Sequence, residues 1–192
     1  DIRQVAAYSN VIGNDVLEEV MDKNLDHFIP IGYTEEELAY AGKFKEVVTE
    51  LDKEGLKDMI AHVVEKDKRK EVLDMPLLDF KLDRSESYGG GGSTDVGDVS
   101  WCVPTAQINT STFPAQAPGH SWQNVSCGRT SIAHKNMLLA GKVIAATAID
   151  LMEKPEVLQA AKDEFNKKMK RYGGYICPIP KDAVPVVPGE KM

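Results

Sequence analysis

Residues 131–152 read SIAHKNMLLAGKVIAATAIDLM and contain the richest apolar segment of a 192-residue chain. Lys142 and Asp150 interrupt this segment, so it does not reach the roughly 18 consecutive apolar residues that a membrane span needs. Pro155 follows shortly after it, and proline cannot continue a helix. The pattern predicts a long buried helix over 131–153 and no contact with a membrane.

Four further stretches have helical spacing of their apolar residues. Residues 13–28 include a possible N-cap at Asn14, and residues 34–54 begin with Thr34 and Glu37 at the spacing of a capping box. Residues 55–73 form a weaker amphipathic pattern. Residues 156–172 form another helix, which we expect to stop at the two glycines 173–174.

Between these helices lie segments with β-branched and alternating residues, typical of strands. Residues 2–10 and 98–113 have this pattern, the second interrupted at Pro104. Residues 75–89 resemble a loop or short strand, and residues 114–128 a loop. We therefore expect an α/β architecture of layered helices and sheet, with helices 34–54 and 131–153 packed on a central sheet.

Composition excludes several classes of function. The formal net charge is −7 and the basic residues are scattered among acidic ones, which argues against nucleic-acid binding. The three cysteines, at 102, 127 and 177, form no CxxC pair, which favours a reducing compartment, the cytoplasm, over a disulfide framework. The first residues, DIRQVAAYSN, lack the apolar core of a signal peptide. They also lack an initial methionine, as in a trimmed chain or one that starts within a larger protein.

The glycine-rich stretch GGGGSTDVGD, residues 89–98, raises the question of what its backbone approaches. A Walker A loop would need a lysine before its Ser/Thr, and none is present. A dinucleotide-binding loop would follow a strand and open a helix, whereas here a strand-like run follows. A flexible linker is disfavoured by Asp95 and Asp98.

A second loop, PGHSWQ, contains His120 and Ser121. Gln123 stands where a nucleophile elbow needs glycine, so a serine hydrolase is disfavoured. His120 lies on a Pro-Gly loop where a side chain can face a cleft, although an idle exposed histidine fits the same pattern. The other histidines lie on predicted helices. With no second histidine nearby, His120 can contribute one ligand to a metal site completed elsewhere.

Three segments together resemble the C-terminal part of the dinuclear-metal amidohydrolases and carboxypeptidases, which include aminoacylases, carboxypeptidase G and indole-acetyl-amino-acid hydrolases. They are GGSTDVGDVSWCVPTAQINTSTFPAQAPGHSWQ (91–123), AHKNMLLAGKVIAATAIDLM (133–152) and IGNDVLEEVMDKNLDHFIPIGYTEEELAYA (12–41). The likeness is greatest to the aminobenzoyl-glutamate hydrolase branch of this family. It covers most of the chain, and its specificity lies in the combination of segments.

The resemblance implies roles for particular residues. His120 matches the family's last metal-ligand histidine, on a loop before the C-terminal helix. Ser93, Thr94 and Asp95 match a loop near the metal cleft, and the glycines before them, Gly91 and Gly92 among them, would let that loop lie against the active-site floor. The metal would be Zn²⁺ or Mn²⁺, in a dinuclear centre that activates water while a glutamate moves the proton. That glutamate and the remaining ligands belong to an N-terminal half that this sequence lacks, so no catalytic residue is assigned here.

The same resemblance divides the chain. Residues 1–12 would end a dimerisation (lid) domain, residues 13–176 would form the C-terminal half of a partial zinc-exopeptidase-like catalytic domain, and residues 177–192 an extended proline-rich tail. The implied function is hydrolysis of an amide bond in a small acyl- or aminobenzoyl-glutamate-like substrate, with this portion inactive alone. The alternative is a non-catalytic chain of the same fold that acts through a partner subunit. Either version predicts a homo-oligomer or a partner subunit.

Overall fold

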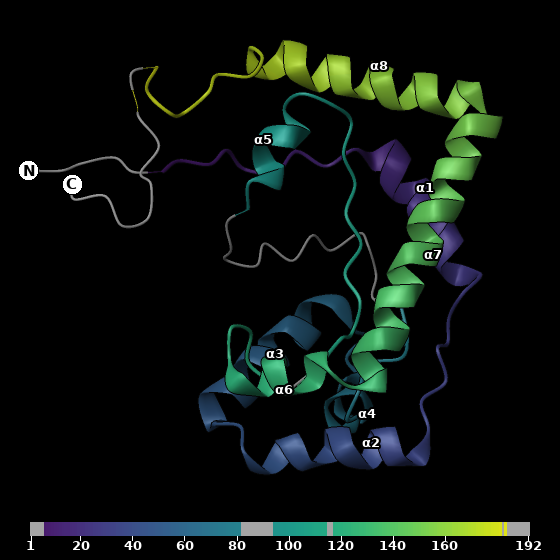
Figure 1. The fold of residues 1–192 in the computed structure, drawn as a ribbon, viewed down its shortest axis with the longest axis vertical. Coiled ribbons are helices and arrows are strands. Elements are labelled where there is room, and N and C mark those ends of the chain that lie inside the picture. Colours follow the sequence, from purple (N-terminus) through teal and green to yellow (C-terminus); the bar gives the residue numbers. More distant parts are fainter. Residues whose placement is uncertain (1–5, 82–93, 115–116, 182, 184–192) are drawn as a thin grey trace, which may run out of the picture. The chain divides into compact units, whose positions relative to one another are not determined.

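A computed structural model describes residues 6–81, 94–114, 117–181 and 183 (Figure 1). The chain divides into two compact units, which are described separately. Unit 1 comprises Asp1–Glu19, Gly91–Gln107 and Leu151–Met192. Unit 2 comprises Val20–Gly90 and Ile108–Asp150.

Helices dominate the described residues of both units. Unit 1 holds α5 (Val96–Ser100) and α8 (Pro155–Tyr172). Unit 2 holds α2 (Glu35–Gly42), the 3₁₀ helix η1 (Lys43–Glu46), α3 (Glu50–Val63), α4 (Arg69–Asp74) and α6 (Trp122–Gly128). Helix α1 (Asp15–Asp26) begins in unit 1 and continues into unit 2, and α7 (Ser131–Glu153) runs from unit 2 into unit 1.

Side chains at the helix ends determine where several helices start and stop. The side-chain oxygen of Asn14 accepts a hydrogen bond from Leu17 N at 3.1 Å, which confirms the predicted N-cap of α1. Pro155 occupies the first turn of α8, and Gly173 ends that helix with a φ of 84° in the left-handed region. The predicted boundaries of α7 and α8 are confirmed.

The single helix predicted over 34–54 is wrong. The chain forms α2 and η1, leaves helical geometry at Val47, and starts again with α3. The cause is a second capping box, in which Thr49 adopts an extended backbone and exchanges hydrogen bonds with Asp52. Because a capping box satisfies amide groups only at the start of a helix, Thr49 favours a new helix over a continued one.

Among the described residues of unit 2, the hydrophobic core contains three small clusters. Ala41, Leu77 and Ile132 join α2 to the start of α7. A second cluster contains Phe44, Ala117 and Cys127, and a third joins α3 to α4 through Leu56, Ile60 and Val72. Tyr40 of α2 also hydrogen-bonds Ser126 of α6 at 2.9 Å. The second cluster holds the segment before α6 against η1 and against Tyr40 of α2.

In unit 1, an extended segment before α1 is held by single contacts. Ser100 Oγ accepts a hydrogen bond from Ile12 N at 2.8 Å, Trp101 Nε1 donates to Asn10 O at 3.0 Å, and Asn14 N donates to Thr105 O at 3.1 Å. Asn14 Nδ2 also donates to Ala161 O of α8 at 2.9 Å. These contacts tie the start of α1 to both α5 and α8.

The predicted α/β sheet is not supported, because no β-strand occurs among the residues that the structure describes. Residues 96–100 of the predicted strand are helix α5, and residues 122–128 of the predicted loop are helix α6. The segments around Asn10 and Thr105 are extended, but their bonds to side chains and single backbone groups do not form a ladder. Alternating residues favour extended backbone, but a strand also needs a paired segment.

Helix α7 is buried on one face only, which corrects the prediction of a buried helix. The buried face carries Ile132, Leu139 and Val143, whereas Leu138 and Ile144 are more than half exposed. Across the described part of the chain, no helix combines the length and apolar character that crossing a membrane requires.

Candidate functional site

The turn that carries His120 is built by Ser121. Ser121 Oγ donates to Pro118 O at 2.6 Å and accepts from Asn124 N at 3.2 Å, so it closes the turn and caps α6. Cys127 and Ala117 lie beneath this segment in the cluster with Phe44. The hydroxyl of Ser121 therefore has a structural role in this turn.

His120 itself is exposed and has a φ of 55°, in the left-handed region that favours glycine. Histidine is among the residues that occupy this region more often than most, at a cost of about 1–2 kcal/mol. The bonds of Ser121 hold the backbone there, and the imidazole lies at the surface. A strained residue with an exposed side chain is compatible with a ligand-binding role.

The neighbouring thiol does not extend this site. Burial raises the pKa of Cys127 to about 11, so the thiol stays protonated at neutral pH. Because a metal binds the thiolate, Cys127 is a poor ligand here. Among the residues that the structure describes, no group of three or more His, Cys, Asp or Glu side chains could hold a metal ion. The described residues therefore do not by themselves fit a dinuclear metal centre.

Part of the predicted active-site loop is described. Gly91, Gly92 and Ser93 lie outside the described residues, while Thr94 and Asp95 lie just before α5. Thr94 O accepts from Gly97 N at 3.1 Å and its Oγ1 accepts from Val96 N at 3.3 Å. Asp95 is exposed and makes no side-chain capping bond to α5. These two residues belong to unit 1 and His120 to unit 2, so a common cleft stays a prediction.

The last glycine of the GGGGSTDVGD stretch has a clear structural cause. Gly97 is buried, and a Cβ atom added to it would lie 1.9 Å from the carbonyl oxygen of Ser9. Asp98 next to it accepts hydrogen bonds from Ser9 Oγ at 2.8 Å and Tyr175 OH at 2.9 Å. The bond from Ser9 is the largest cause that lowers the pKa of Asp98; burial opposes it, and the bond from Tyr175 adds to the lowering. This end of the stretch therefore approaches the protein's own backbone.

A cavity of about 380 Å³ also lies in unit 1, lined by Asn10, Val11, Ile12, Gly13, Trp101, Lys168 and Tyr172. The ammonium of Lys168 is already used, because it donates to Gly13 O at 2.9 Å and pairs with Glu164 at 2.6 Å and Asp15 at 3.3 Å. Glu164 in turn accepts from the backbone of Asp15 and Val16. These charges hold α8 against the start of α1, and they commit the ammonium of Lys168 to the protein's own groups.

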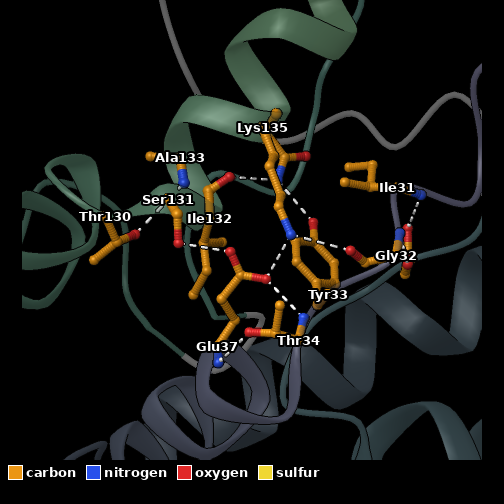
Figure 2. A network of polar contacts seen from close by, with 12 residues as sticks. Ile31, Gly32, Tyr33, Thr34, Glu37, Thr130, Ser131, Ile132, Ala133 and Lys135 are labelled. Atoms are coloured by element: carbon orange, nitrogen blue, oxygen red, sulfur yellow. Dashed lines mark hydrogen bonds and ion pairs between the residues drawn. The ribbon is translucent and has the colours of Figure 1, made fainter.

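A polar network in unit 2 surrounds Glu37 (Figure 2). One carboxylate oxygen accepts from Ser131 Oγ at 2.6 Å, and the other accepts from Lys135 Nζ and Thr34 N, both at 2.7 Å. Burial raises the pKa of Glu37, but the bonds from Lys135, Ser131 and Thr34 outweigh it and hold the pKa at about 2. With these acceptors occupied, Glu37 links α2 to α7.

The sequence indicated only part of these networks. The Thr34–Glu37 spacing predicted the capping box, which is confirmed, but not the bonds of Glu37 to Ser131 and Lys135. The ion pair of Glu164 and Lys168 follows from their spacing of four residues. The bond between Asp98 and Tyr175 joins residues far apart in sequence and had no local signal.

Comparison with known proteins gives the family context. The chain is 37% identical over 186 residues to one subunit of the p-aminobenzoyl-glutamate hydrolase of Escherichia coli (strain K12), a match that covers 93% of this chain and 38% of that protein. It is also 32% identical over 93 residues to a human Xaa-Arg dipeptidase, covering 48% of this chain and 21% of that protein. The resemblance seen in the sequence is confirmed.

The chain is therefore similar to part of a hydrolase subunit and to part of a dipeptidase, and it spans less than two fifths of the length of both relatives. No protein-family model matches the sequence, and no solved structure matches it.

Proposed function

We propose that this chain is the C-terminal portion of a metal-dependent amidohydrolase that acts on an acyl- or aminobenzoyl-glutamate-like amide. The observation that supports this most is the 37% identity, which extends over 93% of the chain, to a p-aminobenzoyl-glutamate hydrolase. The human relative is a dipeptidase, which also cleaves an amide bond. The substrate in this proposal is a small molecule with an amide-linked amino acid.

His120 is the one metal ligand that we assign to this portion, with Zn²⁺ or Mn²⁺ as the metal. Its exposure and its fixed backbone support this role, because the ring is presented to solvent on a turn held by Ser121. A single histidine binds such ions weakly, and stable sites need three or four ligands. Gly91, Gly92, Ser93, Thr94 and Asp95 form the accompanying active-site loop in this proposal.

It follows that this portion is inactive alone and works with further polypeptide, from the same or another chain. The Escherichia coli relative is named as one of the subunits of its enzyme, which supports a multi-subunit assembly. A reducing location, the cytoplasm, is consistent with three free cysteines. The partial catalytic domain assigned to residues 13–176 is part of the same proposal.

Calorimetric titration with Zn²⁺ and with Mn²⁺ tests the assignment of His120. We expect binding in the millimolar range or weaker for this chain. The variants to compare are His120→Ala and, as a matched control, His27→Ala, which removes another exposed histidine of unit 2. Submicromolar binding that is lost in His120→Ala and kept in His27→Ala would show a complete site and contradict the proposed incompleteness.

A second measurement tests the activity. Release of p-aminobenzoate from p-aminobenzoyl-glutamate is followed with each metal present, and the Escherichia coli enzyme serves as the positive control. We expect no turnover by this chain alone. Turnover that disappears in His120→Ala would confirm the reaction class and overturn the inactivity of the isolated portion.

A further inference from the structure

The hydrogen bonds of the extended segment before α1 alternate from one residue to the next. Asn10 O and Ile12 N both bond to residues 100–101, at the end of α5. Gly13 O accepts instead from Lys168 Nζ of α8 at 2.9 Å. In extended backbone, the N–H and C=O of one residue point to one side and those of the next residue to the other. Within residues 10–13, positions 10 and 12 therefore face the end of α5, and positions 11 and 13 face α8.

On the side that faces α8, the backbone of this segment is unpaired. The N–H and C=O of Val11 form no hydrogen bond with another residue that the structure describes, and neither does the N–H of Gly13. Folded proteins pair such groups with other groups or leave them to water. Val11 is 38% exposed, so its groups are within reach from outside. This side is a free edge with which a second extended chain can pair.

The cavity of unit 1 lies beside this edge. Lys168 and Tyr172 of α8 line it together with Val11, and its volume is about 380 Å³. That volume equals roughly 13 waters, or one large side chain with the peptide groups next to it. The rings of Trp101 and Tyr172, with centroids 5.9 Å apart, form an aromatic part of the lining. Edge and cavity together offer backbone pairing and a place for one side chain.

The charges around the cavity favour an uncharged side chain in it. An ammonium group has three N–H donors. That of Lys168 donates to Gly13 O and pairs with Glu164 and Asp15, so no donor is left for an incoming carboxylate. Glu164 and Asp15 do not line the cavity, so an incoming cation finds no carboxylate on its lining. The two aromatic rings instead suit an apolar group.

We propose that an extended segment of the further polypeptide pairs with the free edge at Val11 and places an uncharged apolar side chain against Trp101 and Tyr172. This inference rests on the proposed function, because that function requires further polypeptide. The match covers only 38% of the Escherichia coli relative, so most of that protein has no counterpart in this chain and is long enough to supply such a segment. The backbone bonds set the position of the segment, and the cavity selects its side chain.

Amide hydrogen exchange, followed by NMR, tests the free edge. In this chain we expect the Val11 amide to exchange at least 10-fold faster than that of Ile12, whose N–H donates to Ser100 Oγ at 2.8 Å. In a longer chain or complex that contains the further polypeptide, Val11 should slow at least 10-fold while Ile12, the internal control, changes little. A slow Val11 amide in this chain alone, or a fast one in the longer protein, overturns the proposal.

A short peptide tests the chemistry of the site without the further polypeptide. Acetyl-Ala-Leu-Ala-N-methylamide should shift the NMR signal of the Trp101 indole N–H saturably, with a dissociation constant in the millimolar range. The same peptide with a central glutamate should bind at least five-fold more weakly. No shift with the leucine peptide at about 20 mM overturns the proposal, and equal binding of both peptides contradicts the selection of an uncharged side chain.

Two variants at one position separate backbone pairing from side-chain contact. Val11→Pro removes the N–H but fits extended backbone, and it should weaken binding of the leucine peptide at least five-fold. Val11→Ile keeps the N–H and should bind as the wild type does. Equal binding by all three proteins overturns the pairing. Circular dichroism checks the fold, and Tyr172→Ala, which removes part of the aromatic lining, gives the same test if Val11→Pro unfolds.

Turnover of p-aminobenzoyl-glutamate by the longer protein distinguishes this inference from the proposed function. Turnover together with a fast Val11 amide upholds the hydrolase and overturns the pairing at this edge. A slow Val11 amide without turnover upholds the pairing and contradicts the proposed reaction.

Discussion

The start of α2 and the turn before α6 lie in the same unit, yet they use their polar side chains in opposite ways. At α2, the Glu37 carboxylate is buried and accepts hydrogen bonds from Thr34, Ser131 and Lys135. Before α6, Ser121 makes the structural bonds and the ring of His120 remains exposed. The difference separates a side chain needed for folding from one available to bind a ligand.

The largest expected effect is at Glu37. In Glu37→Gln, the ammonium of Lys135 loses its carboxylate partner, and we expect the free energy of unfolding to fall by about 2–3 kcal/mol. Urea denaturation measures it. Glu36→Gln, in the same helical turn but exposed, should change stability by less than about 0.5 kcal/mol. Equal losses in the two variants would show that the buried network contributes no more than a surface charge.

The pH dependence of stability follows from the same carboxylate. Its pKa is about 2 in the folded protein against a reference value of 4.5, so its contribution is fully present above about pH 4.5. That contribution is lost as the pH falls from 4.5 toward 2, where the folded state also takes up the proton. Thermal unfolding between pH 6 and 2.5 measures the loss, which should be smaller in Glu37→Gln. Parallel curves for the two proteins would contradict the assignment to Glu37.

Ser121→Ala should have a smaller effect, because it removes one helix cap and one turn bond. We expect a loss of about 1 kcal/mol by urea denaturation. Ser121→Asp keeps an N-cap acceptor and should recover most of that loss. If both variants were as stable as wild type, the turn would be held by the cluster beneath it instead.

The smallest effect sharpens the role of His120. Because glycine adopts a positive φ without a steric penalty, His120→Gly should raise the free energy of unfolding by about 0.5–1 kcal/mol. His120→Ala keeps the penalty and should be close to wild type. Destabilisation by His120→Gly comparable to that of Ser121→Ala would show that the imidazole has a structural role.

The sequence predicted local features of this fold well and distant ones poorly. The cap at Asn14, the box at Thr34 and the stop at Gly173 depend on neighbouring residues, and all three are confirmed. The sheet was wrong for the described residues because alternation reports only a local preference for extended backbone. Helix α6 was missed since its apolar pattern is short, although Ser121 three residues before Asn124 was a usable capping signal.

The candidate site shows the same limit. His120 was identified from its Pro-Gly loop and from family resemblance, and its exposure agrees with a ligand role without testing it. The bonds that fix its surroundings could not be foreseen, because the Phe44–Cys127 cluster joins residues more than 80 positions apart. Whether Thr94 and Asp95 act together with His120 is likewise a matter of tertiary arrangement.

The distribution of the three thiols has a practical consequence for spectroscopy. Cys102 and Cys177 are exposed and both belong to unit 1, whereas Cys127 is buried in unit 2. A maleimide dye should therefore react first with Cys102 and Cys177 in unit 1 and leave Cys127 in unit 2 unlabelled. A buried thiol reacts only when its surroundings open. The rate at which Cys127 is labelled would therefore measure how fast unit 2 opens, in the unmodified sequence and without an engineered probe.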